Sequence, residues 1–471
     1  MKTIASEQPT DRIVKMAKIL IAVDHKWRDL AGHVYAGLLL EQLGHEVHYV
    51  RNNLEKNYIT TIKPDLVLMN HLIPPKKQEF AKYLQRQNIR VAILPTEGMP
   101  TLDVMRNHMG GKDCDLSGVD LHFVWNQPMA DILRKNQTLA DDKIVVAGVP
   151  RFDFYKKPLK SILLAKSDFL KKYELDPRYP LVTFATNFTQ ASFHTSNQDF
   201  YLKNAQKYGR DKVFKEVYGD LGDVPKRDHM SRELFLDAFV TLVRNFPEVN
   251  FALKLHPTED HQFYKDLISK ELSSSASRVR IIAHEYIWDV LNATDIELNR
   301  SCTTAIESWL LGKPTIEMQL NPDEYYFSPD FASGSDMVRS SDELIEKVSY
   351  YLSGSSIPQD LQKARDQFLQ KWCHSPDGTS TKTVVDHIHH LLNKRNRIRK
   401  AGDELPADWK RRAYYYLLTV GDHFGHDLRV YGLRNTLNKN YVDKLGRFDK
   451  YFHKRDVEEW EQRLSQAPDQ N

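Results

Sequence analysis

The chain has few cysteines and no extended apolar run. Cys114, Cys302 and Cys373 are the three cysteines among 471 residues. Their odd number and wide spacing argue against a disulfide framework and against a cysteine-based zinc site. No stretch approaches the ~20 apolar residues of a membrane-spanning helix, and the first residues lack the apolar segment of a signal peptide. We therefore expect a protein of the reducing cytoplasm.

Several catalytic motifs are also missing. The sequence has no Gly-x-x-x-x-Gly-Lys phosphate loop, no Gly-x-Ser-x-Gly nucleophile elbow and no cluster of Asp, His and Cys at metal-binding spacing. The net charge of +3, from 66 basic and 63 acidic residues, does not favour a polyanion such as nucleic acid as a partner of the whole molecule. We predict chemistry that needs neither a metal nor another cofactor.

Segments typical of strands and helices alternate along the chain. A first run of strand-like segments, separated by stretches of helical length, covers residues 18–23, 44–50, 65–69, 89–94, 121–125 and 143–147. A second run covers residues 181–185, 250–255, 279–282, 295–298 and 314–318. This alternation is typical of parallel sheets covered by helices on both faces. The sequence therefore predicts an α/β protein with two Rossmann-like domains in tandem that face each other across a cleft.

Composition shifts suggest where these parts begin and end. We predict a polar N-terminal segment (1–17), a first Rossmann-like domain (18–155), a lysine-rich linker (156–177), a second Rossmann-like domain (178–352) with a polar insertion (189–230), C-terminal helices (353–395) and a basic, aromatic tail (396–471). The basic residues of this tail suggest peripheral contact with an anionic membrane. An ordinary amphipathic helix pair packed on the domain is an equal alternative.

Polar residues follow three of the predicted strands, at the edge of the sheet where open α/β sheets bind ligands. Glu97 lies between an apolar strand and Gly98 and is a candidate general base, held partly desolvated; the alternatives are a solvated loop carboxylate or a helix cap. His256, fixed in an extended conformation by Pro257, is a candidate partner for a phosphate oxygen. A histidine without a role is the alternative.

The third signature is a hydroxyl-rich turn before a helix that Gly312 ends. Ser301, Thr303 and Thr304 would offer hydroxyls and unpaired N–H groups to a phosphate, and Glu307 is placed to meet a ribose hydroxyl. Simple capping of the helix, with a favourable charge near its N-terminus, is the alternative.

Two further groups are weaker candidates. Asp24, His25 and Arg28 follow the first strand and are candidates for acceptor binding, although a solvated charged turn is as good an interpretation. His284 follows another strand and is a candidate for framing the nucleobase; packing by the neighbouring aromatic residues is the alternative. Lys254 is expected to point away from the cleft, because alternate strand residues face opposite sides.

Several short motifs resemble those of one enzyme class. Thr96-Glu97-Gly98, residues 148–153 (Gly-Val-Pro-Arg-Phe-Asp), residues 185–188, His256-Pro257 and residues 301–304 followed by Glu307 resemble GT-B glycosyltransferases of bacterial surface-carbohydrate synthesis. The nearest resemblance is to CMP-sugar-dependent sialyltransferases and to the Kdo transferases of capsule and lipopolysaccharide. The segment 148–153 and the hydroxyl-rich helix also resemble CDP-glycerol glycerophosphotransferases and UDP-sugar epimerases.

The resemblance implies an inverting, metal-independent transferase that moves an acidic sugar of the Kdo or nonulosonate type from a CMP-sugar to a glycan or lipid-linked glycan acceptor. Glu97 would be the base, His256 the phosphate partner and acid, and the hydroxyls after Asn299 the phosphate site. Thr96 and Cys302 depart from the motifs of those families. The alternatives are a UDP-sugar transferase, a CDP-glycerol glycerophosphotransferase or an epimerase and, outside the enzymes, a noncatalytic scaffold of polysaccharide assembly.

Overall fold

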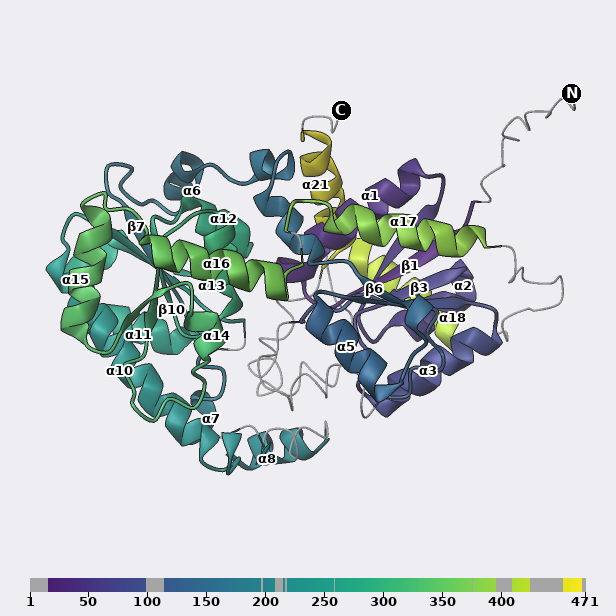
Figure 1. The fold of residues 1–471 in the computed structure, drawn as a ribbon, viewed down its shortest axis with the longest axis horizontal. Coiled ribbons are helices and arrows are strands. Elements are labelled where there is room, and N and C mark those ends of the chain that lie inside the picture. The colour runs from purple at the N-terminus through teal and green to yellow at the C-terminus, as the bar shows by residue number, and fades with distance from the viewer. Residues whose placement is uncertain are drawn as a thin grey trace, which may run out of the picture.

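The computed structural model describes residues 16–98, 114–195, 198–207, 215–216, 218–257, 259–374, 376–394, 409–423 and 452–467. Two α/β domains lie side by side (Figure 1). Each is built on a six-stranded parallel sheet, as the alternation of segments predicted. Within the described residues, no helix has the length and apolar character needed to cross a membrane. Most of the predicted N-terminal segment, and residues 395–408 and 424–451 around the predicted tail, lie outside the description.

The first sheet has the strand order β2-β1-β3-β4-β5-β6. Its strands are β1 (Lys18–Val23), β2 (Glu46–Arg51), β3 (Leu66–Met69), β4 (Arg90–Ile93), β5 (Leu121–Val124) and β6 (Ile144–Val146). One face packs against α1 (Ala31–Gln42) and α17 (Ser380–Asn393), and the other against α2 (Glu55–Ile62), α3 (Pro75–Arg86) and α5 (Gln127–Asn136). These strands are apolar on both faces because helices cover both.

The second sheet has the order β12-β11-β10-β7-β8-β9. Its strands are β7 (Leu181–Ala185), β8 (Asn250–Lys254), β9 (Val279–Ile282), β10 (Ile296–Asn299), β11 (Thr315–Met318) and β12 (Asp336–Val338), the last of which the sequence analysis did not predict. Helices α10 (Val224–Asn245), α11 (His261–Glu271) and α15 (Ser341–Leu352) cover one face. Helices α6 (Lys166–Lys172), α12 (Ile287–Ala293) and α13 (Thr303–Leu310) lie on the other.

The remaining elements connect or extend the two domains. Short helices η2 (Asp141–Lys143), η3 (Pro150–Tyr155), η4 (Leu159–Ile162) and η5 (Ser273–Arg278) lie in connections, and α14 (Pro329–Ala332) precedes β12. The described part of the predicted insertion forms α7 (Ser192–Thr195), α8 (Gln198–Lys207) and the start of α10, and α8 lies at the lower edge of the molecule (Figure 1). Helix α16 (Gln359–Trp372) leads back to the first domain.

A C-terminal helix, α21 (Lys454–Ser465), joins the domains. It packs on α1 in the first domain. In the second domain, Trp460 Nε1 donates to the hydroxyl of Tyr286 at 2.6 Å, and Arg463 forms a bidentate ion pair with Asp289 at 2.7 and 3.0 Å. The junction is further held by Asp153, which accepts from the backbone N–H groups of Ser380 and Thr381. These contacts of α21 link the first domain to the second.

Candidate active site at the domain junction

The three predicted signatures all lie in loops after strands, as expected. Glu97 follows β4, His256 follows β8, and Ser301 follows β10. The loop after β1 forms a short π-helical turn, η1 (Lys26–Leu30), which carries Arg28. Because parallel strands end at the same edge of a sheet, these loops gather at one edge of each domain.

Arg28 is the centre of charge at this junction. Its Nη1 donates to Oε1 of Glu97 at 3.0 Å, its Nη2 to Asp24 at 3.2 Å and its Nε to Asp29 at 2.8 Å. Burial opposes the charge of Arg28, but Asp29 and Glu97 outweigh it and raise the pKa of the guanidinium. Arg28 therefore stays cationic, between carboxylates of its own domain.

Glu97 is more exposed than the sequence analysis expected. Its side chain is 71% exposed, so the predicted desolvation is wrong, and the ion pair with Arg28 orients the carboxylate instead. The backbone of this loop is tied to the protein by Arg151, whose Nη1 donates to the carbonyl oxygen of Thr96 at 2.8 Å. The loop is anchored, while the carboxylate itself is open to a ligand.

His256 lies on the facing domain, in electrostatic reach of Arg28. Although the residue is exposed, the surrounding protein lowers the pKa of His256, and Lys254 and Arg28 lower it further. The imidazole is therefore neutral at neutral pH. A bound phosphate dianion would oppose this shift, because a negative charge favours the imidazolium.

A buried carboxylate holds the loop of His256 in place. Glu259 accepts from the backbone N–H of His256 at 2.8 Å, from the N–H of Phe188 at 3.1 Å and from the hydroxyls of Thr186 and Tyr264, both at 2.5 Å. These bonds tie the loop after β8 to the loop after β7. Sequence analysis missed Glu259, although its place three residues after His256 was a signal.

Lys254 contributes to the same environment. Its side chain is buried, and its Nζ donates to the carbonyl oxygen of Ala283 at 3.1 Å. Burial lowers its pKa to about 8. The expectation that Lys254 points away is compatible with this position, but its charge still acts on His256.

Ser301 is engaged within the protein. Its backbone adopts a positive φ of 43°, and its N–H and Oγ both donate to the carboxylate of Glu317, the latter at 2.8 Å. The same Oγ accepts from the N–H of Ser328 at 2.9 Å. The predicted bond between this hydroxyl and a phosphate would have to replace existing bonds, so Thr303 and Thr304 are the better candidates for binding an anion.

Helix α13 begins at Thr303, directly after this turn. Thr303 and Thr304 are half-buried at its N-terminal end, where helices present N–H groups without intrahelical partners. Beneath them, burial raises the pKa of Glu297 to about 8, and the hydroxyls of Thr304 and Ser308 counteract part of this rise. Thr303 therefore remains a candidate for binding an anion, while the hydroxyl of Thr304 also interacts with Glu297.

Glu307 lies in the domain junction instead of facing open space. Its carboxylate accepts from the hydroxyl of Tyr155 and lies 3.7 Å from Nη2 of Arg151. Since the side chain is buried, the contact with a ribose that the sequence suggested would need a rearrangement. Arg151 thus joins the Glu97 loop to α13 and braces the two domains.

The weaker candidates also have assigned contacts. Nδ1 of His25 accepts from the N–H of Trp27 and caps η1, and Asp24 holds Arg28. The exposed ring of His284 lies 6.1 Å from that of Trp27 across the junction. Tyr286 and Trp288 stack in the core at 5.1 Å, so the packing alternative is confirmed for them.

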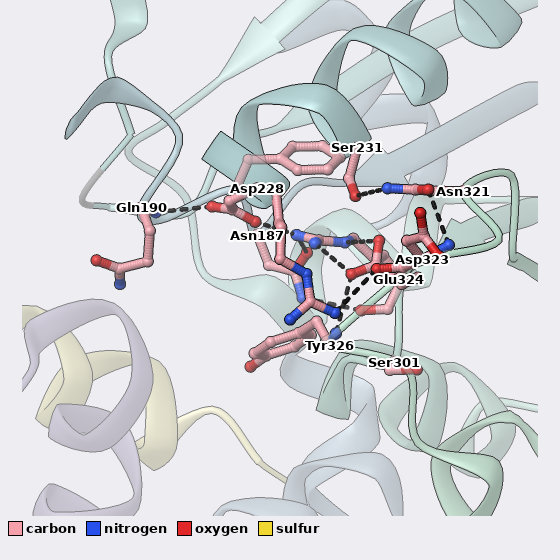
Figure 2. A network of polar contacts seen from close by, with 12 residues as sticks. Asn187, Gln190, Asp228, Ser231, Ser301, Asn321, Asp323, Glu324 and Tyr326 are labelled. Atoms are coloured by element: carbon pink, nitrogen blue, oxygen red, sulfur yellow. Dashed lines mark hydrogen bonds and ion pairs between the residues drawn. The ribbon is translucent and has the colours of Figure 1, made fainter. Parts of the chain in front are cut away.

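A buried arginine network underlies the site and was not predicted. Arg300 pairs with Asp228 at 2.8 Å and with Glu324 at 2.7 Å, and these partners converge in Figure 2. The side chain of Asn187 donates to the carbonyl oxygen of Arg300 at 2.8 Å. Burial opposes the charge, but the two carboxylates raise the pKa of Arg300. This network fixes the loops beside Ser301 and leaves Tyr326, in Figure 2, 36% exposed.

Among the described residues, no group of three or more His, Cys, Asp or Glu side chains is arranged to hold a metal ion. The charged side chains of the loops at the junction include the ion pair of Arg28 with Glu97, and the neutral imidazole of His256 lies within electrostatic reach of Arg28.

The fold and the two facing sets of loops define an enzyme of the glycosyltransferase type with the GT-B fold. More specifically, the chain belongs to the CDP-glycerol:poly(glycerophosphate) glycerophosphotransferase family, whose model matches residues 35–390. No curated protein matches the chain. The family is the one that the sequence analysis held as an alternative. The resemblance to surface-carbohydrate transferases is thus correct for the fold, and the CMP-sugar families are not the ones matched.

Solved structures support the fold. One is a putative UDP-N-acetylglucosamine 2-epimerase from Listeria monocytogenes, which is 12% identical, with 82% of this chain and 99% of that chain covered and a TM-score of 0.51. Another is a variant of the wall teichoic acid polymerase TagF, which is 12% identical, with 82% and 91% covered and a TM-score of 0.50. At such low identity these similarities show the architecture alone.

Proposed function

We propose that the chain transfers a glycerophosphate-type group from a CDP-activated donor to a hydroxyl of a surface-polymer acceptor. The observation that carries this proposal is the position of Arg28, which pairs with Glu97 of the first domain and lies within electrostatic reach of His256 of the second. A cation between a candidate base and a candidate phosphate partner suits a reaction in which negative charge develops on phosphate. Membership of the glycerophosphotransferase family favours this donor.

In the proposed reaction, Glu97 accepts the proton of the acceptor hydroxyl. The acceptor oxygen forms a bond to the β-phosphorus of the donor, and the bond from that phosphorus to the bridging oxygen breaks. The electron pair leaves with CMP. The Arg28 guanidinium neutralises charge on the transferred phosphoryl group, which is the type of stabilisation that phosphoryl transfer depends on.

The second domain would bind the nucleotide part of the donor. The N-terminal end of α13 at Thr303 and Thr304 would hold a phosphate, and Ser301 supports this turn through Glu317. His256 would donate a hydrogen bond to the leaving phosphate as its pKa rises on binding. His284, beside Trp27, would flank the nucleobase of the donor. Asp24, His25 and Arg28 remain the proposed acceptor side.

Transfer of an acidic sugar from a CMP-sugar, the leading interpretation of the sequence, would use the same residues and release the same nucleotide. It differs in the atom attacked, which would be the anomeric carbon. A panel of CDP-glycerol, CMP-linked acidic sugars and UDP-sugars separates these possibilities. We expect acceptor-dependent release of CMP from CDP-glycerol. Release of CMP from a CMP-linked sugar but not from CDP-glycerol, or release of UMP or UDP from a UDP-sugar, would refute the proposed donor.

We also infer that the enzyme works at a membrane surface, because the C-terminal part of the chain combines basic and aromatic residues, which suit an anionic membrane. The substitution Glu97→Gln, which replaces the carboxylate by an amide, should lower turnover by about 10²- to 10⁴-fold without weakening the binding of donor. A variant that turns over at the normal rate would refute the assignment of the base.

A further inference from the structure

Helix α18 (Trp409–His423) exposes an unusual amount of apolar surface. Nine large apolar side chains are exposed in the described residues, and four of them are Trp409 (72%), Tyr416 (60%), Leu417 (50%) and Val420 (55%). Exposed apolar residues are ordinary when they are scattered, but a cluster marks a contact surface. This helix lies beyond the part of the chain that the family model matches.

The exposed residues are not the ones that attach α18 to the protein. Leu418 is buried, and Tyr414 and Tyr415 pack into the core of the first domain, where the ring of Tyr415 lies 5.0 Å from that of Tyr58 on α2. Trp409, Tyr416 and Val420 recur at helical spacing on the opposite side. The helix therefore has two apolar faces, one packed on α2 and one directed outward; Figure 1 shows α18 beside α2.

Basic residues surround the outward face. Lys410 and Arg412 are exposed in the first turn of α18, on either side of Trp409. On the three helices of this layer, α2, α3 and α18, the basic residues with exposed side chains are Lys56, Lys76, Arg86, Lys410 and Arg412, and Glu79 is the one exposed acidic residue among the side chains that the structure describes. Lys77 is buried beside Glu55, and Lys82 pairs with Asp115, so neither adds to this surface. This excess contrasts with the whole chain, whose net charge is only +3.

We propose that α18 is a docking surface for an anionic lipid membrane, with Trp409, Tyr416, Leu417 and Val420 inserted at the level of the headgroups. Aromatic and aliphatic side chains flanked by Lys and Arg are the pattern of helices that lie in the membrane interface. An acidic surface complements the basic layer of α2, α3 and α18. The proposal names the surface for the membrane contact inferred above, but it does not depend on the donor or on the reaction.

Co-sedimentation of the full chain with vesicles tests the proposal. We expect binding to vesicles that contain phosphatidylglycerol, weak binding to pure phosphatidylcholine, and release as salt is raised. The variant Trp409→Ala/Tyr416→Ala/Val420→Ala should lose most of the binding. Lys410→Gln/Arg412→Gln should weaken it about thirtyfold, since each basic residue near the surface contributes roughly a fivefold factor.

A matched control separates this face from general stickiness. On the second domain, Tyr350 is 40% exposed, and the side chain of Lys270 is 83% exposed. Tyr350→Ala/Lys270→Gln should bind vesicles like the wild type. Because all substituted side chains are exposed, circular dichroism and the melting temperature should be unchanged in every variant.

Three results would overturn the proposal. The first is the absence of vesicle binding at low salt, and the second is full binding by the triple alanine variant. The third is self-association without lipid that the triple variant abolishes, which would show that a second copy covers the face. None of these results depends on CDP-glycerol, so failure here and failure of the proposed reaction are distinguishable.

Discussion

The two sides of the site are built differently. In the first domain the candidate base, Glu97, is 71% exposed and is held at its carboxylate by Arg28. In the second domain, buried carboxylates fix the ligand-facing loops from beneath: Glu259 holds the loop of His256, and Glu317 holds the turn at Ser301. The difference suggests a donor side formed before binding and an acceptor side that adjusts when a hydroxyl replaces Arg28 beside Glu97. The following experiments test this division.

The largest effect is expected for Glu97→Gln, which removes the base but keeps the size of the side chain. General bases typically contribute about 10²- to 10⁴-fold to the rate, so kcat should fall by that range. Stabilisation of the protein by CDP should be unchanged, because the donor side is intact. A fall in donor binding equal to the fall in kcat would contradict the division, and Glu79→Gln, an exposed carboxylate on α3, is the matched control.

Glu259→Gln should act on the donor side instead. The two carboxylate oxygens of Glu259 accept hydrogen bonds from four donors. In glutamine an NH₂ group replaces one of these oxygens and cannot accept, so the loop of His256 loses buried hydrogen bonds. We expect a loss of about 1–3 kcal/mol of unfolding free energy and weaker binding of CDP, measured by denaturant unfolding and titration calorimetry. Equal donor affinity in a folded variant would show that the loop does not need this carboxylate.

Glu297→Gln should change the pH dependence of stability. Burial raises the pKa of Glu297 from 4.5 to about 8 in the folded protein, so the folded state holds its proton more tightly than the unfolded state. The stabilisation is fully present below pH 4.5 and is lost as the pH rises from 4.5 through 8. The amide cannot ionise, so the variant should be more stable than the wild type at pH 9 by up to about 5 kcal/mol.

The difference in melting temperature between the two proteins should disappear below pH 4.5, where Glu297 is protonated in both the folded and the unfolded wild type. A difference that is constant with pH would mean that Glu297 is ionised in the folded state.

The smallest effect is expected for Thr303→Val. This change removes one hydroxyl at the start of α13 but leaves the backbone N–H groups in place. One lost hydrogen bond to a charged group corresponds to about 1.5–3 kcal/mol at most, and less where water replaces it. We therefore expect the affinity for the donor, measured by titration calorimetry, to fall a few-fold, with kcat nearly unchanged. Ser308→Ala, buried on the same helix, is the control for a change in helix stability.

Sequence patterns predicted the sheets well because buried parallel strands are apolar throughout. All eleven predicted strands are present, and Glu97, His256 and the turn at Ser301 do follow strands. The contacts of these residues were not predictable, since they join distant parts of the chain. Arg300 meets Asp228, which is 72 positions away, and Arg151 meets Glu307 across the junction. The positive φ at Ser301, whose hydroxyl donates to buried Glu317, could not be predicted from the sequence either, because the pattern that usually indicates a positive φ is a glycine.

The most direct test of the account is phosphorus-31 NMR of the wild-type enzyme with CDP-glycerol and a hydroxyl-terminated glycerophosphate acceptor. The account predicts that CMP and a new phosphodiester signal appear together, in equal amounts, and that neither appears with Glu97→Gln. CMP without the phosphodiester, or no CMP from CDP-glycerol while a parallel reaction with a CMP-linked acidic sugar does release CMP, would contradict it.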